Sequence, residues 1–61
     1  MSNNSNYVFY CKGVCCERNF DNNVCAEYIS FKLKCWVMEQ GFSLDEIEDM
    51  IDKDDAGYYE V

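Results

Sequence analysis

The sequence predicts a small α+β domain that is mainly helical, in which a helical hairpin carries a short strand or hairpin at its amino-terminal end. Three observations support this fold class. Apolar residues recur at helical spacing between about residues 22 and 40, a helix stop and a helix start follow at 41–46, and a β-prone run precedes both at 7–11. A chain of 61 residues allows one domain with a small core, so we expect marginal stability.

Residues 1–6 contain only Met, Ser and Asn, and we expect them to form a flexible amino terminus ahead of a single domain at 7–61. This segment lacks the cationic start and the apolar run of a secretory signal. No stretch of the chain approaches the ~20 consecutive apolar residues that a membrane span requires. Both observations predict a cytoplasmic protein that does not bind a membrane.

The run at 7–11 is rich in aromatic and β-branched residues, which favour a strand. Lys12 and Gly13 can reverse the chain, so that residues 14–16 return as the second strand of a short hairpin. A short helix in the same place would give an all-α three-helix domain, which we keep as the alternative. The Asp-Asn-Asn sequence at 21–23 predicts a loop whose side chains cap the following helix.

The long helix, predicted at about 22–40, carries an apolar stripe whose members are three or four residues apart. The stripe consists of Val24, Tyr28, Phe31, Cys35 and Met38. This spacing is typical of an amphipathic helix with one face on the core. Apolar residues also alternate over 29–37, as in a strand. We favour the helix because strong helix formers are frequent and a Gly follows directly at 41.

Four further apolar residues of the long helix fall outside this stripe. They are Ile29, Leu33, Trp36 and Val37. A short second helix cannot cover both sets, and a large exposed apolar patch usually marks an interaction site. We therefore expect this surplus to contact the amino-terminal segment, a second copy of the chain in a homodimer, or a target protein.

A helix end and a helix start follow one another at 41–47. Gly41 can adopt the left-handed conformation that ends a helix. Ser43 and Glu46 predict a capping box, with Phe42 and Ile47 as the hydrophobic staple. The second helix is expected at about 44–53. Its inner face is expected to consist of Leu44, Ile47, Met50 and Ile51.

Residues 36–51 resemble a helix junction of MerR-type regulators over about a quarter of the chain. The resemblance lies in the Gly-Phe-Ser-Leu-Asp-Glu-Ile sequence at 41–47. The winged region and the basic recognition helix of that family have no counterpart in this sequence. The resemblance therefore implies the helix junction alone, and no function.

The surplus negative charge lies entirely after residue 40. Residues 1–40 hold four acidic and four basic residues, whereas 41–61 hold eight acidic residues and one Lys, and the net charge is −7. On the second helix, acidic residues at 45, 48, 49 and 52 follow the i, i+3, i+4, i+7 pattern of one face. Such a repeat of charge resembles the phosphates of a nucleic-acid strand, although an ordinary solvated face has the same pattern.

These features predict a non-catalytic inhibitor or modulator, of the kind that phages encode, whose acidic helix face engages a basic, nucleic-acid-binding surface of a partner protein. Aromatic residues are common anchors in such interfaces. The expected partner-binding residues are Asp45, Glu48, Asp49, Asp52, Asp54, Asp55, Trp36, Tyr58 and Tyr59. The acidic helix would repel phosphate, so we expect no direct binding of nucleic acid.

Catalysis is not expected from this inventory of residues. The chain has no His, so its cysteines lack their usual general base. A domain of this size also has little room for a ligand pocket of ~300–1,000 Å³. We therefore predict that the protein is not an enzyme.

The five cysteines suggest a second function, because an odd number in a reducing cytosol favours thiols or metal ligands over disulfides. The alternative is a small zinc-binding structural or adaptor module. Its expected ligands are Cys11, Cys15, Cys16 and Cys25. The chain has no Cys-x-x-Cys pair, and buried cysteines often act as small hydrophobes. We therefore favour the protein-binding function, for which we expect no cofactor.

Overall fold

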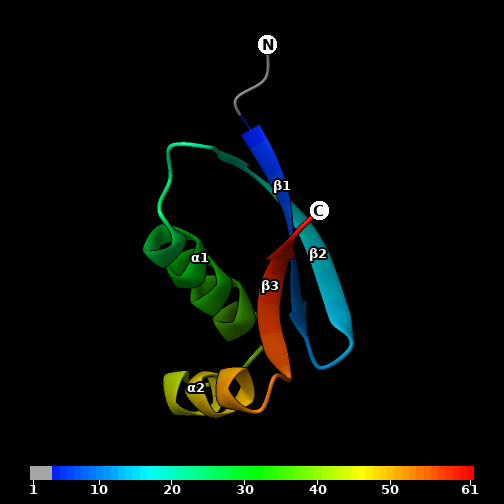
Figure 1. The fold of residues 1–61 in the computed structure, drawn as a ribbon. Coiled ribbons are helices and arrows are strands. Elements are labelled where there is room, and N and C mark those ends of the chain that lie inside the picture. The colour runs from blue at the N-terminus through cyan, green and yellow to red at the C-terminus, as the bar shows by residue number, and fades with distance from the viewer. Residues whose placement is uncertain (1–3) are drawn as a thin grey trace.

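The computed structural model describes residues 4–61, which fold into two helices packed on one face of a three-stranded antiparallel sheet (Figure 1). The elements in chain order are β1 (Asn4–Cys11), β2 (Val14–Asp21), α1 (Ala26–Glu39), α2 (Leu44–Asp52) and β3 (Ala56–Glu60). The strand order is β2-β1-β3, so β1 lies in the centre of the sheet. Neither helix in residues 4–61 is long and apolar enough to span a membrane.

This architecture shows that the predicted fold class is wrong. Neither a helical hairpin with a short amino-terminal strand or hairpin nor an all-α domain describes a chain in which two eight-residue strands and a five-residue strand form one sheet. The strand that the sequence did not reveal is β3. Its Ala-Gly-Tyr-Tyr-Glu sequence has a strand conformation because it pairs with β1, and such pairing partners are not visible in a local pattern.

The hairpin of β1 and β2 turns at Lys12 and Gly13, whose φ angles of 46° and 86° are both left-handed. Two such residues form the tight turn that matches the twist of paired strands. The pairing runs from Cys11 and Val14 back to Asn4 and Asp21, so the hairpin is much longer than the predicted return at 14–16. Of residues 1–6, expected to be flexible, 4–6 belong to β1 and 1–3 lie outside the described residues.

The loop after β2 does not cap α1, contrary to the prediction. The Asp21 carboxylate accepts a hydrogen bond from the backbone N–H of Asn23 at 3.0 Å, which closes a local turn at the end of the strand. The N-cap residue of α1 is Cys25, whose side chain makes no capping hydrogen bond. The first turn of α1 therefore depends on tertiary packing rather than on a cap.

The core lies between the sheet and the helices. Its buried members are Phe9, Cys11, Ile29, Leu33, Trp36, Val37, Ile47, Met50 and Ala56. The inner face predicted for α1 is wrong, because Phe31 is 59% exposed and Met38 is 51% exposed. The four apolar residues outside the predicted stripe form the buried face instead. They contact the amino-terminal segment, which is one of the three contacts that we expected for them.

The junction between the helices matches its prediction closely. Gly41 has a φ of 102°, which is left-handed, and its backbone N–H donates to the Met38 carbonyl at 3.0 Å. Ser43 and Glu46 form the predicted capping box, with side chain to backbone distances of 3.3 Å and 3.0 Å. The cap defines where α2 begins, and burial of Ile47 and Met50 sets the direction in which its acidic side chains point.

Candidate functional site

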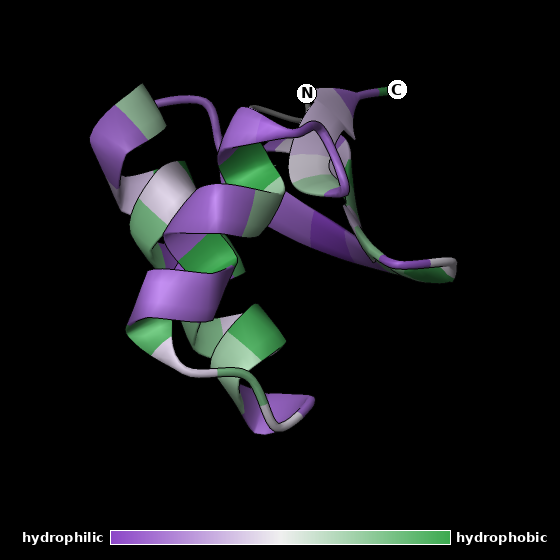
Figure 2. Ribbon diagram, turned by 90° about the horizontal axis from the view of Figure 1, so that it is seen from below, coloured by the Kyte–Doolittle hydropathy of each residue, from purple (hydrophilic) through white to green (hydrophobic). Residues whose placement is uncertain are grey.

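One face of α2 presents four exposed carboxylates to solvent. The opposite face is fixed by Ile47 and Met50, which are 0% and 4% exposed. We call the four exposed residues the acidic stripe; they are Asp45, Glu48, Asp49 and Asp52. Figure 2 shows hydrophilic and hydrophobic segments alternating along α2, as expected for a helix with one buried face.

The acidic stripe keeps most of its charge uncompensated. The Lys53 ammonium lies 3.1 Å from the Asp49 carboxylate, and this is the ion pair found in residues 4–61. Both side chains are more than half exposed, so water and salt screen the pair strongly. Like charges three and four residues apart repel one another on a helix. The stripe therefore has an outward negative field at some cost to the stability of α2.

Asp54 and Asp55 lie in the turn between α2 and β3, next to the stripe in sequence. Asp54 is left-handed, with a φ of 64°, and its carboxylate accepts a hydrogen bond from the Tyr10 hydroxyl at 2.7 Å. This hydrogen bond is the main cause that raises the pKa of Tyr10. The carbonyl of Asp55 accepts from the backbone N–H of Lys12 at 2.9 Å. Asp54 thus has a structural contact of its own, while both side chains stay exposed.

The three aromatic residues predicted as anchors lie in different places. Trp36 is 7% exposed and packs on Phe9, with ring centroids 6.1 Å apart. Tyr58 is half-buried on the same side of the sheet and also packs on Phe9, at 6.1 Å. Tyr59 is 52% exposed and lies on the sheet face that the helices leave open. The structure therefore brings none of the three together with the acidic stripe.

Two apolar residues of α2 lie at the surface, although the sequence placed them on its inner face. Leu44 is 49% exposed and Ile51 is 37% exposed. They are seven residues apart, so they lie on one flank of the helix, with Glu48 between them. Ile51 lies only about 40° from Ile47 around the helix, so helical spacing alone could not separate it from the buried pair.

Comparison with known proteins supplies no relative. No family model matches the chain, and neither a curated protein nor a solved structure matches it. The resemblance of residues 36–51 to MerR-type regulators remains a similarity of one helix junction.

The structure does not bring the four predicted zinc ligands together. Cys15 and Cys16 are neighbours in β2, so their side chains point to opposite faces of the sheet. Cys11 is 1% exposed in the core, and Cys25 is exposed at the start of α1. Within residues 4–61, no three His, Cys, Asp or Glu side chains form a group that could hold a metal ion. The zinc module remains an untested prediction.

The structure has two grooves whose volumes are larger than we expected for a chain of this length. One, of about 380 Å³, lies between β2 and α1. The other, of about 400 Å³, lies beside β3 and is lined by side chains of both helices, including Leu33 and Ile51. Both volumes fall at the lower end of the range of small-molecule sites, so the domain has more room for a pocket than we expected from its length.

Proposed function

We propose that the protein is a non-catalytic binding module that presents α2 to a basic surface of a partner protein, in particular to a surface that otherwise holds nucleic acid. The observation that carries this proposal is the acidic stripe with Leu44 and Ile51 on its flank, all exposed on one capped helix. Trp36 and Tyr58 are left out of the proposed surface because they belong to the packing around Phe9.

The exposed apolar flank favours a binding surface over a solvated face. A face that serves only solubility gains nothing from Leu44 and Ile51 at the surface. Protein interfaces, in contrast, combine a small apolar centre with charged groups at the rim. The carboxylates would steer a cationic partner toward the apolar flank, and burial of that flank would then slow dissociation.

The charge pattern favours a partner that normally binds nucleic acid. Stripe residues three or four positions apart are separated by about 4.5–6 Å along the helix axis, which is a repeat that a row of basic side chains built for phosphates can meet. The net charge of −7 adds a long-range field of the same sign. Occupation of such a surface would exclude nucleic acid, which makes the protein an inhibitor or modulator of its partner.

The test compares three proteins immobilised on a support. The first is the wild type, and the second is a four-amide variant, Asp45→Asn, Glu48→Gln, Asp49→Asn and Asp52→Asn. The third is a matched control with four exposed carboxylates neutralised elsewhere, Glu17→Gln, Glu27→Gln, Glu39→Gln and Glu60→Gln. Both variants have a net charge of −3, because four of the seven excess negative charges are removed.

Each protein is presented with a cell extract freed of nucleic acid, and retained proteins are identified by mass spectrometry. We expect the wild type and the matched control to retain a protein that added duplex DNA or RNA releases. The four-amide variant should retain about tenfold less of it, and retention should fall steeply between about 50 and 200 mM salt. Equal loss in both variants would mean that net charge alone acts. Retention by all three proteins would mean that the stripe is only a solvated face.

A further inference from the structure

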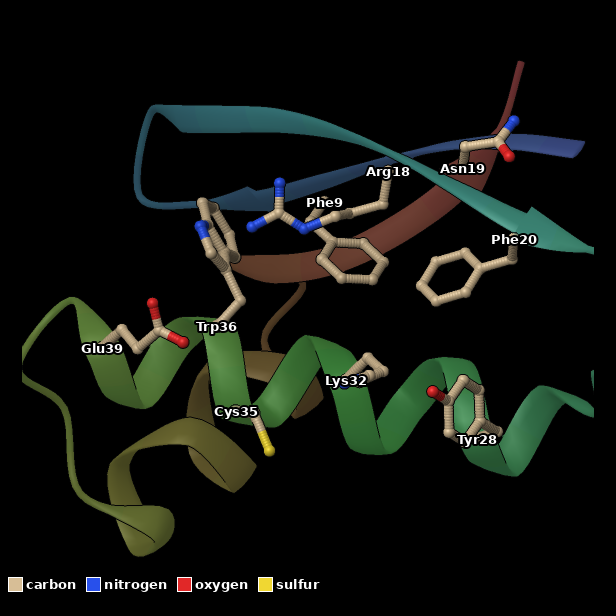
Figure 3. Close-up of a pocket in the computed structure, with 9 residues that line it drawn as sticks. All are labelled: Phe9, Arg18, Asn19, Phe20, Tyr28, Lys32, Cys35, Trp36 and Glu39. Carbon is tan, nitrogen blue, oxygen red and sulfur yellow. The ribbon is translucent and has the colours of Figure 1, made fainter.

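The groove between β2 and α1 exists because the helices cover the sheet unevenly. The buried sheet residues Phe9, Cys11 and Ala56 all belong to β1 and β3. The inner side of the edge strand β2 is covered only in part, since Cys16 and Phe20 are half-buried there. The space left between this strand and α1 has a volume of about 380 Å³. Figure 3 shows the side chains that line this space.

Aromatic rings form the floor of this groove. Phe9 lies between Trp36 and Phe20, with ring centroid distances of 6.1 Å and 5.9 Å. Tyr28 meets the edge of Phe20 at 6.1 Å with an interplanar angle of 89°. Figure 3 shows these rings along the space between the strand and the helix. Phe9 is fully buried, so the rings that a ligand can reach are mainly those of Phe20 and Tyr28. Offset and edge-on contacts with these rings favour a planar apolar ligand.

Two cations stand on opposite walls of the groove, and neither has an acidic partner among the described residues. Arg18 comes from β2 and Lys32 from α1. The Arg18 guanidinium makes only a long hydrogen bond of 3.4 Å, to the backbone carbonyl of Glu17, and the Lys32 ammonium lies 5.7 Å over the Tyr28 ring. Glu39 is the acidic residue in the lining, beside Trp36 on α1.

The charge of the groove is opposite to that of the whole chain. None of the lining residues comes from 41–61, where the surplus of acidic residues lies. Two cations and one carboxylate therefore give the lining a positive balance in a protein with a net charge of −7. An anion in the groove would find unpaired guanidinium and ammonium donors, which bind carboxylates more strongly than neutral donors do.

We infer that this groove is a binding site for a small aromatic anion, whose ring lies against Phe20 and Tyr28 while its anionic group contacts Arg18 and Lys32. The site is separate from the acidic stripe on α2. Its volume suits a ligand of one or two rings, since small-molecule sites begin at about 300 Å³. The groove contains no residue of the acidic stripe, so a failure of this inference would not contradict the proposed protein partner.

The test uses 1-naphthoate as the probe and follows the indole N–H signal of Trp36 by two-dimensional NMR. Trp36 is the single Trp of the chain, so this signal reports on the groove without assignment ambiguity. We expect a saturable shift with 1-naphthoate, and binding about tenfold weaker for 1-naphthylmethylammonium, which has the same ring and the opposite charge. The double variant Arg18→Gln and Lys32→Gln should lose this preference for the anion.

Two further variants separate the groove from general charge and from misfolding. The variant Lys12→Gln and Lys34→Gln removes the same charge outside this groove and should keep the affinity. The variant Arg18→Lys and Lys32→Arg keeps both charges and should keep the preference for the anion. The inference is overturned by an absence of saturable shift, by equal binding of the cationic probe, or by full affinity in the double variant that lacks both groove cations.

Discussion

Residue 57 must be a Gly because the side chain of Tyr10 occupies the space beside it. A Cβ atom on residue 57 would lie 2.6 Å from the Tyr10 hydroxyl oxygen and 2.9 Å from the ring carbon that bears it. The ring crosses the strand at this Gly, and its hydroxyl then reaches the Asp54 carboxylate. The absence of a side chain in β3 therefore permits a hydrogen bond between β1 and the turn after α2.

The five cysteines are not equivalent, and alkylation should reveal this. At about pH 8, we expect iodoacetamide to modify Cys11 about tenfold or more slowly than Cys15 and Cys25. Cys11 is 1% exposed, and desolvation by burial raises the pKa of its thiol, although the charge of Lys12 acts in the opposite direction. Peptide mass spectrometry over a time course gives each rate. Denaturant should make the rates equal, and fast labelling of Cys11 in the native protein would contradict its position in the core.

At the scale of elements, the two helices begin in different ways. The start of α2 is specified locally, by the reciprocal hydrogen bonds of Ser43 and Glu46. The start of α1 has no side-chain cap, and its first turns are fixed by burial of Ile29 and Leu33 against the sheet. Local capping explains why α2 is predictable from sequence. Its absence explains why the predicted start of α1 was four residues too early.

Removal of the cap should destabilise the protein by a moderate amount. Ser43→Ala is expected to lower the free energy of unfolding by about 1 kcal/mol, because the backbone N–H of Glu46 loses its acceptor. Ser43→Asp supplies an equivalent acceptor and serves as the control. Urea unfolding followed by circular dichroism measures both. Equal stability of the Ala variant and the wild type would mean that solvent replaces the cap at no cost.

The same cap predicts a dependence of stability on pH. Hydrogen bonds from Ser43, first from its backbone N–H and then from its side chain, lower the pKa of Glu46 below its ordinary value of 4.5. A lowered pKa in the folded state means that the carboxylate contributes stability above about pH 4.5, and that this contribution is lost as the pH falls through the lowered pKa. Glu46→Gln keeps an acceptor but does not titrate, so its stability should fall less than that of the wild type between about pH 5 and 3.

At the scale of the whole molecule, the fold depends on pairing between segments that are far apart in sequence. β3 pairs with β1 in a register that joins Tyr7 to Glu60. The pairing completes the sheet and places Ala56 in the core, directly opposite Cys11. A domain of this size buries a smaller fraction of its surface on folding than a larger domain does, so it has little stability in reserve if one strand is lost.

Deletion of residues 56–61 should therefore abolish cooperative unfolding. The central strand β1 would lose its hydrogen-bonding partner on one side, and Cys11 would be exposed to water. Thermal unfolding followed by far-ultraviolet circular dichroism measures the effect. Tyr59→Ala is the control, because that ring is 52% exposed and its loss should cost less than about 1 kcal/mol. A cooperative transition at an unchanged temperature in the truncated protein would contradict this account of the sheet.

The sequence by itself determined those features that depend on neighbours within a few residues. The helix stop at Gly41, the capping box of Ser43 and Glu46, and the turn at Lys12 and Gly13 were all predictable, because backbone conformation and capping are local. The acidic stripe was predictable for the same reason, since helical spacing alone aligns its four members.

Only the tertiary structure decided which faces are buried. Two apolar sets on α1 fit the helical repeat equally well, and the position of the sheet buried the one that contains Leu33 and Trp36 rather than the one that contains Phe31. The third strand, the exposure of Leu44 and Ile51, and the groove beside β2 depend in the same way on distant segments. Burial is a property of two packed surfaces, and a sequence pattern describes only one of them.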